Sequence, residues 1–225
     1  MGDGLCVHCR ESRPEFERAA SFGEYTGSLR GLIHLLKYEG VTPAQAPLAQ
    51  MLAEVISELL PPSQVSVQET DANLRHQTGD AKLLLIPVPL HRSRRRSRGF
   101  NQAELLARAA QKRLSGKIEL VSDALIRQRE TVSQVGLSRE ERIENMRDAF
   151  RVNDRNRVKG RNVIVVDDVM TTGTTLSECA RILKRAGANQ VWAATVARAF
   201  YGADLPEAAD DGEQEEVEAA VAASV

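Results

Sequence analysis

The second half of the chain alternates strand-like and helix-like hydrophobic patterns. Residues 83–86 and 163–166 are short, unbroken aliphatic runs, typical of strands that are buried on both faces. A helix is predicted after the first run, with Asn101 as its N-cap. After the second run, residues 176–186 repeat apolar positions at helical spacing, and residues 191–196 predict another strand. This alternation predicts an α/β fold with a mainly parallel sheet flanked by helices.

The first 62 residues contain helix-like rather than strand-like patterns. Two helices are predicted within residues 25–60, separated by Gly40 and Pro43. Weaker strands are expected near residues 124–126 and 149–152. The chain is therefore divided into a polar N-terminal segment (1–24), a helical region (25–62), a polar loop (63–81), an α/β core (82–202) and a tail (203–225).

Charge is distributed unevenly along the chain. The net charge is −1, but residues 203–225 carry eight acidic residues and no Lys or Arg. Residues 1–202 therefore carry 30 basic and 23 acidic residues, a net charge of +7. We expect the acidic tail to be disordered, because it has too few large apolar residues to offset the entropy of ordering. The basic body favours phosphate-bearing ligands or nucleic acid, although a solvated basic surface is an alternative.

The hydropathy pattern predicts a protein that is not inserted into a membrane. No window approaches 18 consecutive apolar residues, and the first residues lack the basic-then-apolar order of a signal peptide. We therefore expect a cytoplasmic location.

Cysteine usage predicts at most half of a metal site. Cys6 and Cys9 form one Cys-x-x-Cys, which supplies two of the four ligands that a structural zinc ion requires. His8 lies between them and His34 has unsuitable spacing. A solvent-exposed remnant and a half-site completed by another chain are both compatible with this pattern.

The strongest chemical motif runs Val163-Ile-Val-Val-Asp-Asp-Val-Met-Thr-Thr-Gly-Thr-Thr175. Ligands bind at the carboxyl ends of strands in such sheets, and the N-terminus of the following helix suits a phosphate. Asp167 and Asp168 can accept hydrogen bonds from sugar hydroxyls or face Mg²⁺. A phosphate, a diol and a metal within one loop together describe a phosphorylated ribose. A Walker B strand is disfavoured because the chain contains no G-x-x-x-x-G-K-[ST].

This motif resembles the phosphoribosyl diphosphate (PRPP) binding motif of type I phosphoribosyltransferases. Over about residues 5–200, the chain resembles the ComF family of phosphoribosyltransferase-like proteins, which are associated with bacterial competence. The further matching segments are Tyr25–Tyr38, Ile86–Leu90, Arg98–Gln102 and Arg127–Phe150, the last with Thr131, Gln134, Leu137, Arg142 and Asn145.

The resemblance implies a type I phosphoribosyltransferase fold with an N-terminal helical hood region, and it assigns roles to several groups of residues. The implied PRPP-binding residues are Asp167, Asp168, Thr171, Thr172, Gly173, Thr174 and Thr175, the two aspartates also being catalytic. The implied pyrophosphate loop is Val88, Pro89, Leu90 and Arg92, followed by Arg94, Arg95, Arg96 and Arg98. A mobile hood is implied at residues 127–148, with Arg127, Thr131, Gln134 and Arg142 in its flexible loop.

The implied reaction displaces pyrophosphate from C1 of PRPP through an oxocarbenium-like state, with Mg²⁺ and arginine offsetting charge on the leaving group. Enzymes that act on 6-oxopurines carry an aspartate at the position of Thr171, so such a purine is not the expected acceptor. No glutaminase domain accompanies the motif. A DNA-uptake role offers an alternative, in which the protein binds single-stranded DNA or other competence proteins and the PRPP site is a sensor or relic.

The family pattern also includes a four-cysteine zinc ribbon, of which this sequence shows only Cys6 and Cys9. Either the coding sequence starts upstream of Met1 or this member has lost the metal, so zinc is not assigned.

Overall fold

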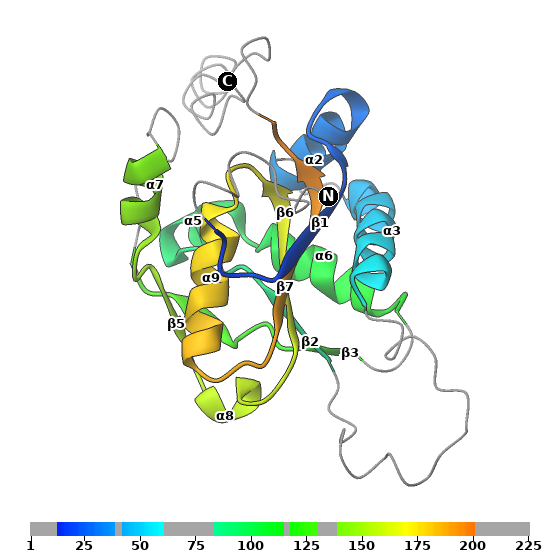
Figure 1. Ribbon diagram of the computed structural model, residues 1–225. Coiled ribbons are helices and arrows are strands. Elements are labelled where there is room, and N and C mark those ends of the chain that lie inside the picture. Colours follow the sequence, from blue (N-terminus) through cyan, green and yellow to red (C-terminus); the bar gives the residue numbers. More distant parts are fainter. Residues whose placement is uncertain (1–12, 39–41, 61–82, 115–117, 130–138, 201–225) are drawn as a thin grey trace, which may run out of the picture.

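A five-stranded parallel sheet forms the centre of the protein, whose computed structural model describes residues 13–38, 42–60, 83–114, 118–129 and 139–200 (Figure 1). Its strands are β1 (Arg18–Glu24), β2 (Leu83–Pro87), β3 (Ile118–Leu120), β6 (Val163–Met170) and β7 (Val191–Arg198). They lie in the order β1–β7–β6–β2–β3, and every pair is parallel. All five strands therefore end at the same edge, where the acidic motif of β6 also lies.

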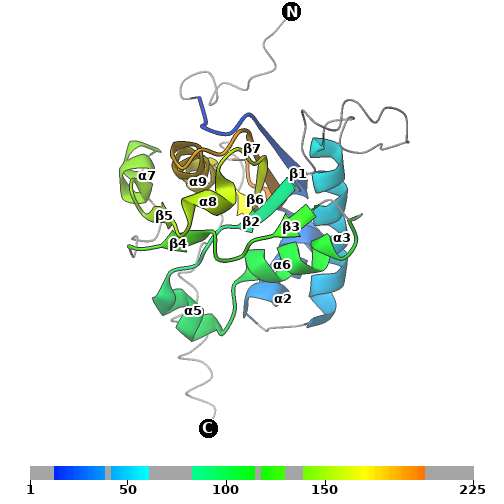
Figure 2. The same ribbon diagram turned by 90° about the horizontal axis from the view of Figure 1, so that it is seen from below.

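Helices cover both faces of this sheet, as Figure 2 shows from below. One face carries α2 (Gly27–Tyr38), α3 (Thr42–Leu59) and α6 (Gln102–Gln111). The other face carries α9 (Thr174–Arg185) and a small unit made of β4 (Leu125–Arg127), α7 (Arg139–Met146), β5 (Phe150–Val152) and α8 (Arg155–Val158). The expected parallel sheet between two helical layers is confirmed.

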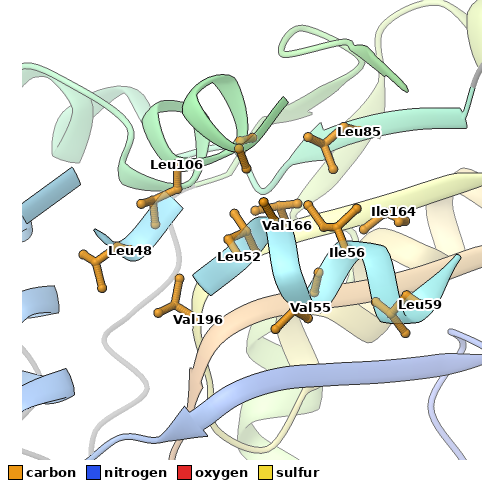
Figure 3. Close-up of a cluster of buried hydrophobic side chains, with 14 of the residues drawn as sticks. Leu48, Leu52, Val55, Ile56, Leu59, Leu85, Leu106, Ile164, Val166 and Val196 are labelled. Carbon is orange, nitrogen blue, oxygen red and sulfur yellow. The ribbon is translucent and has the colours of Figure 1, made fainter. Parts of the chain in front are cut away.

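The core on the α3 side is built from aliphatic side chains at helical spacing. Leu52 and Ile56 of α3 are fully buried and belong to one cluster with Ile164 and Val166 of β6 (Figure 3). Val163 and Val165 alternate with them and face the cluster beneath α9. Because both faces of β6 are covered, its sequence is continuously apolar up to Val166.

Several predicted elements are confirmed at residue level. Asn101 caps α6, since its Oδ1 accepts a hydrogen bond from the Ala103 N–H at 3.1 Å. The helices expected within residues 25–60 correspond to α2 and α3, which bury Ile33, Leu36 and the apolar stripe of α3.

Other expectations need correction. No strand was expected before residue 25, but β1 pairs with β7 at the edge of the main sheet. The arginine-rich segment predicted as a loop forms the helix α5 (Arg92–Arg98). The weak strands near residues 124–126 and 149–152 exist as β4 and β5, yet they pair with each other in a separate two-stranded antiparallel sheet.

Several sequence predictions fall outside the described residues. The polar loop 63–81, the acidic tail 203–225 and the Cys-x-x-Cys of residues 6–9 cannot be compared with the structure. Within the described ranges, no helix is both long and apolar enough to span a bilayer.

Candidate functional site

The turn between β6 and α9 presents unpaired backbone donors at the carboxyl edge of the sheet. Gly173 is the N-cap of α9 with φ 77°, and no side chain caps the helix. The N–H groups of Thr171, Thr172, Gly173 and Thr174 donate to no group among the described residues. Four donors next to a positive helix end suit a phosphate group.

The threonine hydroxyls add further donors to this turn. The Oγ1 atoms of Thr172 and Thr174 lie 2.8 Å apart and share a hydrogen bond. Thr172 is exposed, whereas Thr171, Thr174 and Thr175 are partly buried. The turn is therefore accessible to solvent at Thr172, and the hydrogen bond between the two hydroxyls restricts its conformation.

Asp167 and Asp168 precede the turn and are partly buried. Oδ1 of Asp167 accepts the Asp168 N–H, and Oδ1 of Asp168 accepts the Val169 N–H, both at 2.9 Å. These local bonds hold one oxygen of each carboxyl group in place. Burial, and then the negative charge of Asp168, raise the pKa of Asp167 well above its ordinary value.

Lys37 of α2 reaches this acidic pair from the helical region. Its Nζ lies 3.4 Å from Oδ2 of Asp168, and both side chains are largely buried. The buried face of α2, which includes Ile33 and Leu36, holds the helix where Lys37 can make this contact. The sequence motif at residues 25–38 contains Lys37 but offers no sign of its partner, which is 131 positions away in the chain.

The predicted pyrophosphate loop lies directly beside the acidic pair. The Val88 N–H donates to the carbonyl of Val166 at 2.8 Å, which places residues 88–90 next to the end of β6. Nδ2 of Asn101 donates to the carbonyl of Val88 at 2.9 Å, so the cap of α6 also anchors this segment. Sequence reasoning identified Asn101 as a cap and missed this second contact.

The helix α5 begins directly after residues 88–90 and their cap His91, and it buries no side chain. His91 and Gly99 cap its two ends, with the Gly99 N–H donating to the carbonyl of Arg95 at 2.9 Å. Arg92, Arg95 and Arg96 are exposed. The predicted concentration of guanidinium groups is thus presented by a short helix rather than by an irregular loop.

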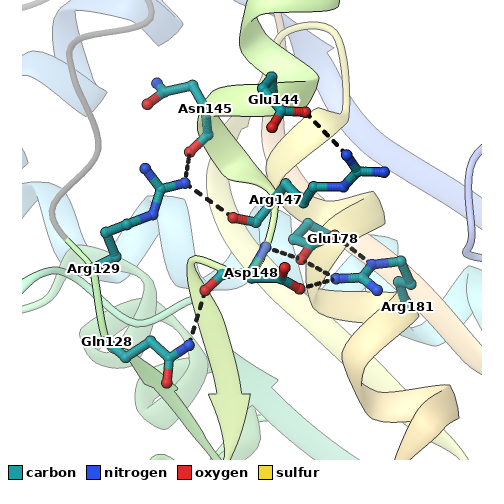
Figure 4. A network of polar contacts seen from close by, with 8 residues as sticks. All are labelled: Gln128, Arg129, Glu144, Asn145, Arg147, Asp148, Glu178 and Arg181. Atoms are coloured by element: carbon teal, nitrogen blue, oxygen red, sulfur yellow. Dashed lines mark hydrogen bonds and ion pairs between the residues drawn. The ribbon is translucent and has the colours of Figure 1, made fainter.

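The end of the mobile hood predicted at residues 127–148 is anchored on α9 through a polar network (Figure 4). Glu178 of α9 accepts the Asp148 N–H at 2.9 Å and pairs with Arg181 at 2.6 Å, while Arg181 also contacts Oδ1 of Asp148 at 2.9 Å. The guanidinium of Arg127 lies 5.5 Å from the centre of the Phe150 ring.

The remaining predicted site residues are not brought into this arrangement by the described part of the chain. Arg142 belongs to α7, and Thr131 and Gln134 lie outside the described residues. Cys6 and Cys9 also lie outside them, and the described ranges contain no group of three or more His, Cys, Asp or Glu side chains that could hold a metal.

Replacing Asp167 by asparagine is expected to stabilise the protein at neutral pH. The raised pKa means that folding favours the protonated carboxyl, so wild-type stability falls as pH rises above the ordinary value of 3.8. Asparagine keeps the acceptor for the Asp168 N–H without the buried charge. Thermal unfolding at neutral pH should show a rise of a few degrees, since about 1 kcal/mol corresponds to roughly 2–4 °C in a chain of this size.

The difference between the two proteins should shrink toward acid pH, where the wild-type carboxyl is also neutral. The exposed cap variant Asp154→Asn serves as a control and should show no such rise. An equal or lower unfolding temperature for Asp167→Asn at neutral pH would contradict the assignment of a costly buried charge.

Comparison with known proteins identifies the family. Residues 97–223 match the model of the phosphoribosyl transferase domain. The DNA utilization protein YhgH of Escherichia coli O6:H1 is 34% identical over 190 residues, covering 83% of this chain and 75% of that protein. Competence protein F of Haemophilus influenzae is 29% identical over 195 residues, covering 86% and 78%.

A solved structure of a hypoxanthine phosphoribosyltransferase from Staphylococcus aureus is 11% identical, covers 69% of this chain and 74% of its own, and gives a TM-score of 0.40. The assignment itself rests on the sequence matches and on the parallel sheet with its strand–turn–helix motif. The chain therefore belongs to the phosphoribosyl transferase domain family and, within it, to the type I phosphoribosyltransferase-like ComF proteins associated with competence.

Proposed function

We propose that the protein binds PRPP together with Mg²⁺ and transfers its phosphoribosyl group to an acceptor. The observation that carries the proposal is the arrangement of the β6–α9 turn. There, two adjacent carboxyl groups lie at the carboxyl edge of a parallel sheet, beside four backbone N–H groups that have no acceptor among the described residues. Carboxylates bind a ribose diol and amides bind a phosphate, so one turn offers both halves of ribose 5-phosphate.

We assign each part of PRPP to a group of this chain's residues. The 5-phosphate would lie on the N–H groups of residues 171–174, and the ribose hydroxyls against Asp167 and Asp168. The pyrophosphate would lie toward Val88–Leu90, which are joined to β6 by the Val88–Val166 hydrogen bond. The exposed arginines of α5 follow this segment and carry the positive charge that a pyrophosphate requires.

Mg²⁺ fits this site as an ion that arrives with the substrate. The described residues supply carboxylate oxygens from Asp167 and Asp168 but no set of three metal-binding side chains. Mg²⁺ in proteins is commonly held by one or two carboxylates and by the phosphates of the substrate. When bound, the ion would neutralise charge on the pyrophosphate.

The proposed reaction forms one bond at C1 and breaks another. The C1–O bond breaks, and its electron pair goes to the pyrophosphate oxygen. The acceptor forms the new bond by donating an electron pair to C1. The acceptor loses a proton when it bears one. Positive charge develops on the ribose ring between these two events, close to the carboxyl groups. Carboxylates and guanidinium groups fixed in place before reaction therefore stabilise the charges that appear during it.

Calorimetric titration with PRPP and Mg²⁺ tests the proposal. The wild-type protein should show saturable binding, and Asp168→Asn should bind about 10-fold to 100-fold more weakly, because a hydrogen bond to a charged group contributes about 1.5–3 kcal/mol. The control Asp123→Asn changes an exposed carboxylate that is paired with Arg157 and should bind like wild type. Absence of binding at millimolar PRPP would refute the proposal.

A second candidate function is the handling of single-stranded DNA. It is favoured by the exposed arginines of α5 and by the names of two relatives, a DNA utilization protein and a competence protein. Few aromatic residues are available for base stacking, since they make up 4% of the sequence. A titration with a single-stranded oligonucleotide separates this candidate from the transferase proposal. If the protein handles DNA, the oligonucleotide should bind more weakly as salt rises, and Asp168→Asn should not change its affinity.

A further inference from the structure

The exposed side of α2 carries an open cavity that the proposed PRPP site does not use. Its volume is about 510 Å³. The described residues that line it are Gly27, Arg30, Gly31, His34 and Leu35. The cavity therefore combines two cationic or hydrogen-bonding side chains, one apolar side chain and a stretch of exposed helix backbone.

The geometry of α2 connects this cavity to the acidic pair. Arg30, His34 and Lys37 are spaced by four and three residues, so they lie on one face of the helix. With a rise of 1.5 Å per residue, Lys37 is about 4.5 Å beyond His34 and about 10.5 Å beyond Arg30 along the axis. Because Lys37 contacts Asp168, the cavity lies within the length of a nucleotide from the proposed ribose site.

Arg30 points to a negatively charged ligand. It is partly buried, and its guanidinium has no hydrogen bond or ion pair with any described residue. The nitrogen atoms of this guanidinium remain accessible, so a phosphate can approach them and accept two parallel hydrogen bonds.

Gly31 points to close approach of that ligand. It lies within α2, where glycine is less favourable than alanine. A Cβ added at this position would meet nothing within 4 Å, so packing inside the protein does not require a glycine. Its effect is to leave room over the helix backbone between Arg30 and His34.

We propose that this cavity binds the phosphate group of the acceptor, a nucleotide either free or at the end of a single strand. Arg30 would bind the phosphate, with His34 beside it on the same helix face, and Leu35 would contact the apolar part of the nucleotide. The proposal rests on the proposed function, because it identifies the acceptor class by its position beside the PRPP site. A phosphate at Arg30 would leave the rest of the nucleotide directed along α2 toward Asp168.

Titrations with four probes test this site: dTMP, oligothymidylate with a 5′-phosphate, the same strand without it, and inorganic phosphate. The phosphorylated probes should bind wild type, and Arg30→Ala should weaken that binding about tenfold or more. The matched control Arg18→Ala removes an exposed arginine at the opposite edge of the sheet and should leave binding unchanged. Binding of dTMP would indicate a free nucleotide, and binding of the phosphorylated strand alone would indicate a strand end.

A second variant excludes misfolding as an explanation. Gly31→Gln fills the cavity with a residue that favours helix, so the unfolding temperature should rise while phosphate binding weakens. Equal binding of phosphorylated and unphosphorylated strands, or equal effects of Arg30→Ala and Arg18→Ala, would overturn the proposal.

Titration of the same variants with PRPP separates this inference from the proposed function. Arg30→Ala and Gly31→Gln should bind PRPP like wild type, because neither residue belongs to the PRPP site. If PRPP binds but none of the phosphate-bearing probes does, the inference fails and the proposed function survives. If the probes bind as expected but PRPP does not, the cavity is a phosphate site and the transferase proposal fails.

Discussion

Replacing Glu178 by leucine is expected to lower the free energy of unfolding by about 3–5 kcal/mol, the usual cost of breaking a buried ion pair. The carboxylate is 10% exposed and Arg181 is 19% exposed, so neither charge is fully solvated. Loss of Glu178 leaves the Asp148 N–H without its acceptor. Among the described residues, it leaves Arg181 paired with the carboxylate of Asp148 alone. The network joins α9 to the segment between α7 and β5, so this segment should loosen first.

Thermal unfolding measures the loss of stability, and hydrogen exchange of residues 139–152 locates it. Glu144→Leu is the matched control, because Glu144 and Arg147 form an ion pair of the same spacing but are 73% and 67% exposed. That variant should lose less than about 1 kcal/mol. Similar losses of stability for both variants, or unchanged hydrogen exchange in residues 139–152, would show that the network does not hold this segment on α9.

The elements predicted well from the sequence are those with strong hydrophobic periodicity. β6, α9 and β7 bury continuous or helical stripes, and their order alone predicts a parallel sheet with its ligand site at one edge. The acidic pair and its following turn were located for the same reason, since a strand that ends in two carboxylates interrupts the apolar pattern.

The elements missed from the sequence have no such pattern. β1 consists largely of small and polar residues and is stabilised by β7, more than 170 positions away, through contacts such as Ser21 Oγ to Thr195 Oγ1 at 2.7 Å. α5 buries nothing, so no hydrophobic spacing marks it as a helix; only the His91 and Gly99 caps do. Local periodicity contains no information on either kind of contact.

The candidate site was likewise predicted only in part. The residues of the turn are contiguous and could be recognised as a motif, but Lys37 and Asn101 enter the site through tertiary packing. Lys37 faces Asp168 because α2 packs on α3 and the sheet, and Asn101 anchors Val88 because α6 begins below that strand end. One sequence without structure offers no signal that pairs such distant positions.

Replacing Gly173 by valine is expected to reduce PRPP affinity by about 100-fold or more. Gly173 has φ 77°, a conformation that β-branched residues rarely adopt, so valine should force the turn into another shape. Space is not the obstacle, because an added Cβ would lie 3.7 Å from Met170 and from Phe16, an ordinary contact distance. A reshaped turn would misdirect at least two of the N–H donors, each contributing about 1.5–3 kcal/mol to a charged phosphate.

The control for this variant is Gly160→Val, since Gly160 has φ 71° in the turn that leads into β6, at the far end of that strand from the acidic pair. Both variants should lose about 1–2 kcal/mol of stability, because each places a side chain in the left-handed region. Only Gly173→Val should also lose PRPP affinity in calorimetric titration. Equal PRPP affinity in the two variants would mean that the backbone of the β6–α9 turn does not hold the 5-phosphate.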